Sequence, residues 1–243
     1  MGYLETQWQR GRKIYGKRSW RETRRTFLHT MRSIRNKREI EALESYFASY
    51  TPDPTLLDRQ VGLFELMTRY FLFKSSTPQE RLEAIINHFD YLKDVFTDEA
   101  IREMYSVDPD NIYDDVSRMN RGFIVWESED LDMVARLYYG PGQRKEGFLT
   151  LLLTLGKQGV YHANFRLGKG FNGEPAMWIG TIQGYKDGLD NAKTVTKKMF
   201  GYRPKNFIMF LLRHIAVLCK VESIYAVSDE GFYANTHLVR GHR

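Results

Sequence analysis

The sequence has a single cysteine, Cys219, among its 243 residues. One cysteine forms no intramolecular disulfide and cannot build a cysteine-based zinc site. Folds stabilised by disulfides and folds stabilised by such a zinc site are therefore both excluded. No apolar run reaches the roughly 18 residues of a membrane-spanning helix. The start at Met1-Gly2-Tyr3 leads into a polar, basic segment without the apolar region of a secretory signal. We therefore expect a cytoplasmic protein without a transmembrane segment.

Common catalytic signatures are also missing. The sequence contains no Walker phosphate loop, no Gly-x-Gly-x-x-Gly after a predicted strand, no Gly-x-Ser-x-Gly elbow and no His-Glu-x-x-His pair. No two of the six histidines stand three or four residues apart on one predicted helix, so we expect no metal site. Most ATPase, dinucleotide-binding, hydrolase and zinc-protease functions are thereby excluded.

What the sequence does have is core-forming material and uneven charge. Apolar residues make up 42% of the chain and aromatic residues 14%, which suits a globular protein of this length. Residues 1–38 carry twelve Lys or Arg against two acids, residues 80–136 carry fifteen acids against six bases, and residues 137–243 carry fifteen bases against seven acids. This layout is typical of an interaction surface. Nucleic acid is not expected as a partner, because no RNA- or DNA-binding motif accompanies the net charge of +6.

Residues 1–50 are predicted to form a basic amphipathic helical segment. Between 17 and 38, apolar residues recur at offsets of seven, four and three, which marks one stripe of a helix: Trp20, Phe27, Met31 and Ile34. One interpretation is that this stripe, flanked by Arg24 and Arg25, lies on an anionic membrane surface, so that the protein is peripheral to the inner membrane. The alternative is that the stripe docks on the body of the protein and leaves the charges in water.

Residues 51–120 are predicted to form a helical subdomain. A helix with a broad apolar face is expected at 55–73, after two prolines. A second helix begins after Thr77, because Pro78 and Glu80 complete a capping box there. A shorter helix is expected to follow Thr97.

Residues 121–243 are predicted to form an α+β ligand-binding core. Short runs rich in β-branched and aromatic residues, separated by glycine-rich turns, indicate strands at 123–126, 133–139, 148–155, 160–167 and 177–183. Helices are expected at 191–200 and 204–220, and a last strand at 223–228. The expected fold class is therefore α+β, with N-terminal helices followed by an antiparallel β-meander, two helices and a returning strand.

Polar residues gather around the last predicted strands and helices. A phosphate-bearing ligand held by backbone donors and cationic side chains would draw on these residues: Gln183, Gly184, Lys197, Arg203, Lys205, Arg213 and Ser228. The alternative needs no ligand, since Gly201 and Pro204 also suit an ordinary turn between two helices. Gly184 likewise has two interpretations, as a point where a ligand approaches the backbone closely or as a turn residue with positive φ.

A base for proton transfer would come from three residues after the last strand, namely Asp229, Glu230 and His237. Cys219 follows Val217 and Leu218, which predicts a small buried residue and not a nucleophile.

Five segments in the C-terminal half occur in a recognisable order: QRKEGFLTL at 143–151, WIGTIQG at 178–184, TKKMFGYRPK at 196–205, LLRHIA at 211–216 and IYAVS at 224–228. Together they resemble the VirK/YbjX family of Gram-negative bacteria, a family of unknown function, and RLEAIINHF at 81–89 resembles its helical half more loosely. The resemblance implies a role in the bacterial envelope, in virulence, lipid A status and antimicrobial-peptide tolerance. It also implies a further aromatic and basic stretch after Arg243, and it brings no catalytic residue with it.

The expected element order also resembles the core of the acyl-CoA-dependent N-acetyltransferase superfamily. That resemblance implies pyrophosphate binding in the turn at 183–188, although Lys186 stands where the superfamily's pattern has its first glycine.

The sequence supports two hypotheses about the function of this protein. The first is a transferase that moves an acyl or aminoacyl group onto the amine of a small molecule or peptide, with acyl-CoA or another phosphate-bearing acyl carrier as cofactor. The second is a non-catalytic envelope-associated protein that binds anionic lipid or a protein partner.

Overall fold

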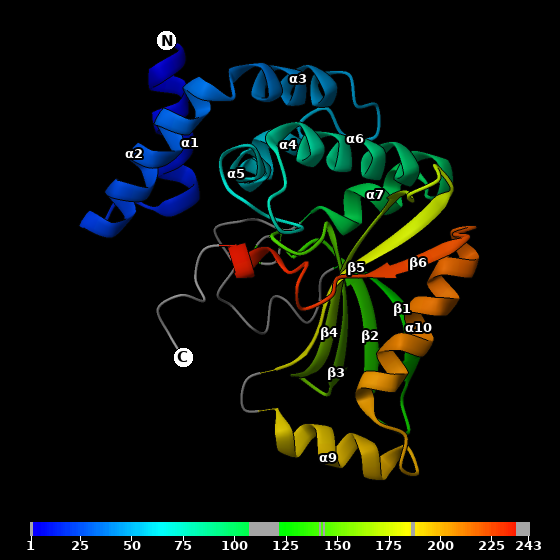
Figure 1. The fold of residues 1–243 in the computed structure, drawn as a ribbon. Coiled ribbons are helices and arrows are strands. Elements are labelled where there is room, and N and C mark those ends of the chain that lie inside the picture. The colour runs from blue at the N-terminus through cyan, green and yellow to red at the C-terminus, as the bar shows by residue number, and fades with distance from the viewer. Residues whose placement is uncertain (1, 107–121, 141, 143, 186–187, 237–243) are drawn as a thin grey trace.

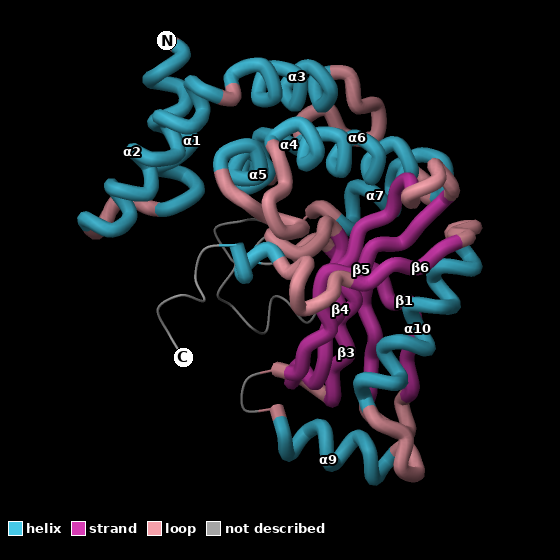
Figure 2. The backbone as a smooth tube through the Cα atoms, in the orientation of Figure 1, coloured by secondary structure: helices cyan, strands magenta, loops and turns pink. Residues whose placement is uncertain are grey.

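Helices form the first part of the chain (Figure 1). The computed structural model describes residues 2–106, 122–140, 142, 144–185 and 188–236. The helices before the sheet are α1 (Tyr3–Tyr15), α2 (Trp20–Arg35), α3 (Lys37–Ala48), α4 (Leu56–Arg59), α5 (Phe64–Thr68), α6 (Pro78–Val95) and α7 (Asp98–Met104). Figure 2 shows them gathered beyond one end of the strands. The predicted starts after Thr77 and Thr97 are confirmed, since both side chains cap the helices that follow.

The helix predicted at 17–38 is confirmed in a shorter form as α2. Its start is fixed by a capping box, in which Ser19 Oγ accepts a hydrogen bond from the Glu22 N–H and the Glu22 carboxylate accepts one from the Ser19 N–H. The apolar stripe faces outward, with Trp20 80% exposed and Phe27 52% exposed. The prediction that this stripe docks on the body is therefore wrong.

Small and polar residues pack α2 against the protein instead: Thr26, His29, Thr30 and Ser33. Their small size lets α1 and α2 approach closely. A Cβ atom on Gly11 of α1 would lie 2.9 Å from Thr26 Cγ2, so only glycine fits at this crossing without displacing its neighbour. Close packing of the small residues thus decides which face of α2 is buried.

The single helix predicted at 55–73 is wrong. The chain forms α4, a 3-10 turn (Val61–Leu63) and α5, and helical structure ends at Thr68 because Arg69 is extended. The Gln60 side chain donates to the Tyr105 carbonyl where α4 ends, and the Leu72 N–H donates to the Lys145 carbonyl at 2.7 Å. Contacts between segments far apart in the sequence therefore override the helical periodicity of this stretch.

The sheet has six strands in the order β1-β2-β3-β4-β5-β6, which confirms the predicted α+β class and its meander. The strands are β1 (Phe123–Ser128), β2 (Met133–Tyr138), β3 (Leu149–Leu155), β4 (Gln158–Lys169), β5 (Pro175–Gly184) and β6 (Ser223–Ala226). Pairs from β1 to β5 are antiparallel, and β6 is parallel to β5. A parallel pair needs a crossover, which α9 (Leu189–Lys198) and α10 (Pro204–Leu218) supply.

The crossover also confirms two sequence predictions. Gly201 has φ +92° and its N–H donates to the Thr196 carbonyl, which ends α9, and Pro204 is the first residue of α10. Cys219 is buried after α10, as predicted, and burial raises the pKa of its thiol to about 11.

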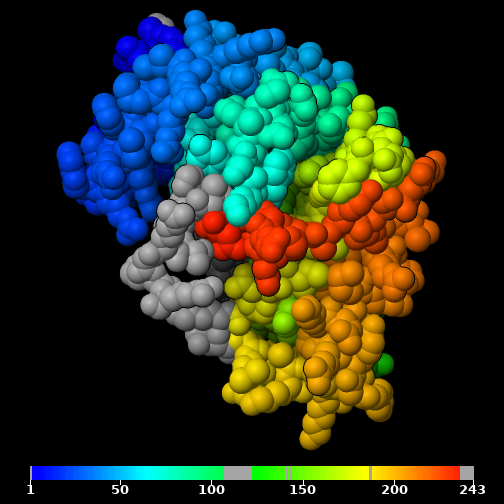
Figure 3. Space-filling view, viewed as in Figure 1, coloured from blue at the N-terminus to red at the C-terminus, as the bar shows by residue number. Residues whose placement is uncertain are grey.

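Figure 3 shows β6 and the segment that follows it crossing the visible face between the α4–α6 region and the α9–α10 region. Within the described ranges, no helix has the length and apolar character required to cross a bilayer. The division of the chain at residues 50 and 120 stays a prediction.

Candidate functional site

A pocket lies where β6 separates from β5. The two strands pair only as far as Ile179 and Ala226, and the last contact is the Val227 N–H donating to the Ile179 carbonyl at 3.0 Å. Beyond it the chain turns away, because the Gly231 carbonyl accepts from the Lys74 N–H at 2.9 Å. The separation leaves a pocket of about 550 Å³. Its lining comes from the 72–73 loop, α6, β4, β5 and the end of β6: Leu72, Phe73, Glu80, Glu83, Ala84, Asn87, Glu146, Arg166, Lys169, Phe171, Trp178, Ile179, Gly180, Ala226, Val227, Ser228 and Gly231.

A β-bulge at Gly180 shapes the floor of this pocket. Thr181 and Ile179 pair with successive residues of β4, so Gly180 is the extra residue of β5. A Cβ atom at this position would overlap the carbonyl oxygen of Glu146. Glycine is therefore required at the bulge, because the backbone of Glu146 passes directly over it.

Glu146 is an acid of the pocket whose carboxylate is held in place by a chain of hydrogen bonds. Its carboxylate accepts a hydrogen bond from Asn164 Nδ2 at 3.0 Å, and Asn164 Oδ1 in turn accepts from Thr150 Oγ1 at 2.9 Å. Burial raises the pKa of Glu146 above its ordinary value, although the Asn164 hydrogen bond and Lys145 oppose the rise. An oriented carboxyl group with a raised pKa is suited to proton transfer near neutral pH.

Arg166 brings a positive charge to the same pocket. Its guanidinium carbon lies 4.6 Å from the centre of the Trp178 ring. Within the described part of the chain it has no ion pair and no side-chain hydrogen bond. Burial lowers the pKa of Arg166 to about 10, so the group remains cationic at neutral pH. A partly buried cation without a described carboxylate partner costs free energy that an anionic ligand would recover.

Aromatic residues form one wall of the pocket. Trp178 stacks on Tyr225 with ring centres 4.5 Å apart, and Phe171 meets both rings edge-on at 4.9 Å. Phe171 is 77% exposed, so the wall continues to the surface of the protein. The pocket thus combines a partly buried cation, an oriented carboxyl group and an apolar surface, which is the usual composition of a site for a small organic anion.

The sequence-predicted residues are divided between this pocket and other places. Ser228 lines it, and Asp229 and Glu230 follow directly in the exposed turn. His237 lies outside the described residues. Gln183 is exposed at the opposite end of β5.

Gly184 does not have a positive φ, so the turn interpretation of this glycine is wrong. A Cβ atom there would lie 3.1 Å from Tyr161 Cε2, and the close approach of that ring explains the glycine.

The remaining predicted cations are spread along α9 and α10 and do not line this pocket: Lys197, Arg203, Lys205 and Arg213. All four side chains are exposed. Arg203 precedes α10 and makes no side-chain cap to it. As for metals, the described residues contain no group of three or more His, Cys, Asp or Glu side chains that could hold an ion.

Sequence reasoning missed Glu146, Arg166 and Gly180. A signal for Arg166 was present, because it is the one charged residue in the run at 160–167, where a strand rich in apolar residues was predicted. Glu146 and Gly180 gave no such signal. Their roles depend on how the segment before β3 crosses β5, which is a tertiary contact.

One comparison with known proteins gives a match. A family model described as a protein of unknown function, DUF535, matches residues 18–243. No curated protein and no solved structure matches the chain.

Proposed function

Because this chain belongs to the DUF535 family of proteins of unknown function, we propose its function from the pocket: it is a transferase that moves an acyl or aminoacyl group onto an amine. The observation that carries the proposal is that the partly buried Arg166, which has no ion pair among the described residues, lines the same pocket as an oriented Glu146, at the point where two parallel strands separate. The cation would hold a phosphate or carboxylate of the acyl carrier. The carboxyl group would serve as the base.

The proposed reaction uses residues that line this pocket. The amine nitrogen attacks the carbonyl carbon of the carried acyl group and forms the new C–N bond. Glu146 takes the proton that the amine loses. The bond between the carbonyl carbon and the carrier's sulfur or oxygen then breaks, and the proton passes to that leaving atom. The extra residue of a bulge lies outside the regular ladder, so the backbone at Gly180 is placed to polarise the carbonyl.

Two resemblances support this proposal. The element order, a meander followed by two helices and a returning strand, resembles the core of the acyl-CoA-dependent N-acetyltransferases. The five C-terminal segments resemble the VirK/YbjX family, which connects the activity to envelope and lipid A maintenance and to antimicrobial-peptide tolerance. On this proposal acyl-CoA or another phosphate-bearing carrier is the cofactor.

A second candidate function comes from α2. Its outward stripe places Trp20, Phe27 and Met31 in solvent, and no described part of the protein covers them. Exposed apolar residues among arginines suit the surface of an anionic bilayer. The second candidate is therefore a non-catalytic protein at the periphery of the envelope, bound to anionic lipid or to a protein partner.

A pair of matched variants tests the transferase. Arg166→Gln removes the partly buried cation of the pocket, and Arg203→Gln removes an exposed cation at the start of α10. We expect Arg166→Gln to weaken acyl-CoA binding at least tenfold in calorimetry, Arg166→Lys to retain part of it, and Arg203→Gln to leave it within twofold. The reverse pattern would move the carrier to the turn predicted from the sequence.

Glu146→Gln separates binding from chemistry. The amide keeps the shape of the side chain and cannot accept the proton, so we expect carrier binding to remain while transfer to an amine falls about a hundredfold. Thiol release from acyl-CoA measures the transfer. If neither acyl-CoA nor an acylated carrier protein binds the unaltered protein, the transferase proposal fails and the second candidate remains.

A further inference from the structure

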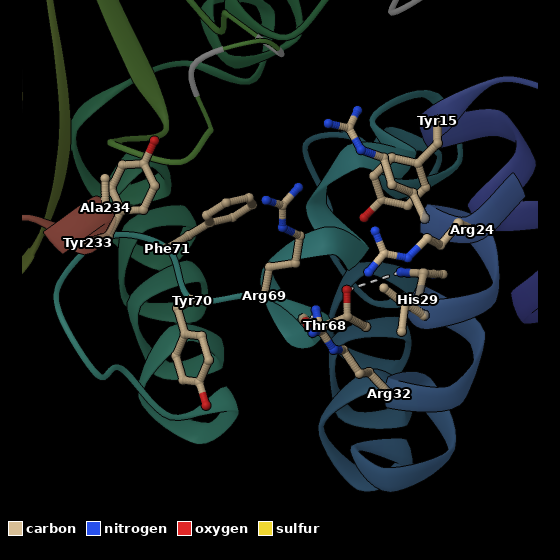
Figure 4. Close-up of a pocket in the computed structure, with 12 residues that line it drawn as sticks. Tyr15, Arg24, His29, Arg32, Thr68, Arg69, Tyr70, Phe71, Tyr233 and Ala234 are labelled. Carbon is tan, nitrogen blue, oxygen red and sulfur yellow. Dashed lines mark hydrogen bonds between the residues drawn. The ribbon is translucent and has the colours of Figure 1, made fainter. Parts of the chain in front are cut away.

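A second pocket lies on the other side of α5, between α2 and the turn that follows β6. Its volume is about 770 Å³. Figure 4 shows residues of α2 on one side and aromatic residues on the other, with Arg69 between them. The lining residues are Tyr15, Arg24, Arg25, Leu28, His29, Arg32, Thr68, Arg69, Tyr70, Phe71, Tyr233 and Ala234. None of the sequence-predicted ligand residues on β5, α9 or α10 contributes to it.

Among the described residues, the lining contains four arginines and no acid. Arg24 and Arg25 make no ion pair in the described ranges of the chain. Arg32 donates one hydrogen bond to the Thr68 carbonyl at 3.2 Å, and its other donors remain open. Arg69 is the only one of the four with a described carboxylate partner, Glu65.

Glu65 does not neutralise the rest of the pocket. It is 1% exposed, and its carboxylate already accepts hydrogen bonds from Tyr15, Arg69 and Arg144. These donors hold its pKa below the ordinary value, against the effect of burial. Three arginines therefore face the pocket with uncompensated charge.

The neutral side chains of the pocket are placed to bind the organic part of a ligand. Phe71 and Tyr233 meet edge-on with ring centres 5.7 Å apart, and Tyr70 is 48% exposed beside them. His29 lies at the base with Nδ1 3.1 Å from Thr68 Oγ1, and the Thr68 hydroxyl donates to the Glu65 carbonyl, so His29 Nδ1 carries the proton. Burial lowers the pKa of His29 to about 4, and the ring adds no charge at neutral pH.

We propose that this pocket binds a phosphate monoester, with the phosphate on Arg24, Arg25 and Arg32 and the organic part against Tyr70, Phe71 and Tyr233. Arg25 and Arg32 stand seven residues apart on one helix, or roughly 10 Å along its axis, so long side chains can converge from both ends of the pocket. A monoester is a dianion near neutral pH with three acceptor oxygens, which matches several planar donor groups better than a singly charged anion does. The phosphate belongs either to a soluble metabolite or to a lipid head group.

Small-molecule probes test whether the phosphate monoester belongs to a soluble metabolite. Phenyl phosphate combines both features, inorganic phosphate lacks the ring, and phenyl sulfate has one charge fewer. Calorimetry with the full chain at low salt is expected to rank phenyl phosphate first, at least fivefold above each of the others. The variant Arg24→Gln/Arg25→Gln should bind phenyl phosphate with an affinity at least tenfold lower than that of the unaltered protein. The control Arg21→Gln/Arg35→Gln removes two exposed charges of the same helix outside the lining and should change affinity less than twofold.

Vesicles test the lipid source. Phosphatidic acid carries a phosphate monoester and phosphatidylglycerol a diester, and the two are compared at equal surface charge. Preference for phosphatidic acid that Arg24→Gln/Arg25→Gln abolishes and the control retains would assign the pocket to a lipid head group. The proposal is overturned if neither probe series shows a preference for the monoester, or if the variant and its control lose binding equally. Arg166→Gln leaves the outcome unchanged, so failure here is separate from failure of the transferase.

Discussion

Three buried histidines predict that mild acid unfolds this protein. His29 is 2% exposed, His88 0% and His162 7%. Burial lowers the pKa of His29 and of His162 to about 4 and that of His88 to about 3. Each ring is therefore neutral in the folded protein at pH 5, whereas the same ring in the unfolded chain has an ordinary pKa near 6.5 and is protonated.

The sign and the size of the change in stability with pH follow from proton linkage. Since the unfolded state binds more protons, stability falls as the pH drops from about 6.5, and the loss continues until the folded-state pKa near 4, or near 3 for His88, is reached. Between pH 7 and pH 5 each histidine lowers the free energy of unfolding by roughly 2 kcal/mol, and the three together lower it by about 6 kcal/mol. Glu146 acts in the opposite direction because its pKa is raised. The net loss is comparable with the whole stability of many domains, about 5–15 kcal/mol.

His88 is the best single position for the test. Its Nδ1 accepts the Leu167 N–H at 3.1 Å, and its Nε2 lies 2.8 Å from the Tyr105 hydroxyl, which donates to the Phe148 carbonyl. Nδ1 is therefore unprotonated, and a second proton would break the bond to Leu167. His88→Gln removes the titrating group while keeping an amide near the position of Nε2.

Urea unfolding at pH 7 and at pH 5 measures the effect. We expect His88→Gln to be less stable than the parent at pH 7 but to lose about 2 kcal/mol less on acidification. His214→Gln, on the exposed side of α10, is the matched control, and its stability should fall between pH 7 and pH 5 as much as that of the parent. Should His88→Gln fail to fold, the ring signals of the parent decide by NMR, since three histidines must not titrate between pH 7 and pH 5. The reasoning would be refuted if both variants lost the same amount of stability between pH 7 and pH 5, or if all the histidine rings titrated near pH 6.5.

The other predictions concern α2 and β5. Trp20→Ser/Phe27→Ser should reduce flotation with anionic vesicles severalfold and change the melting temperature little, because both side chains are exposed; unchanged flotation would contradict a membrane role for the stripe. Gly180→Ala should destabilise the protein by several kcal/mol, since the added methyl group meets backbone, whereas Gly184→Ala on the same strand meets only the edge of the Tyr161 ring and should cost about 1 kcal/mol or less. Thermal melts of the two glycine variants compare them directly, and equal losses would refute the assignment of the bulge.

Local signals in the sequence were sufficient for much of the fold. The capping box at Thr77 starts α6 as predicted, and the glycine-rich turns separate the strands of the meander at nearly the predicted positions. These features depend on hydrogen bonds and turn geometry within a few residues. The stretch at 55–73 has an equally clear helical pattern, but Gln60 and Leu72 are held by residues more than 40 positions away, and the pattern alone gives no sign of that.

The site was harder to predict for the same reason. Ser228 lies in the lining of the pocket, and the end of a strand, where it stands, is a common place for ligand contacts. Arg203 and Lys205 were chosen for their charge at the start of a helix, yet both side chains face solvent outside the pocket. What distinguishes Arg166 from them is partial burial without an ion pair among the described residues, and burial is known only after the sheet and α6 have been brought together.

The contact between Lys74 and Gly231 also sets the order in which the protein can mature on the ribosome. It joins positions 157 residues apart, so the wall of the pocket cannot close until the segment beyond β6 has left the exit tunnel. The antiparallel strands from β1 to β5 pair with their neighbours in the chain and can assemble earlier, while synthesis continues. During that interval β5 lacks its parallel neighbour and offers an open edge to other chains. Slow translation just after β5 would prolong this exposure, and a chaperone that shields the edge would shorten it.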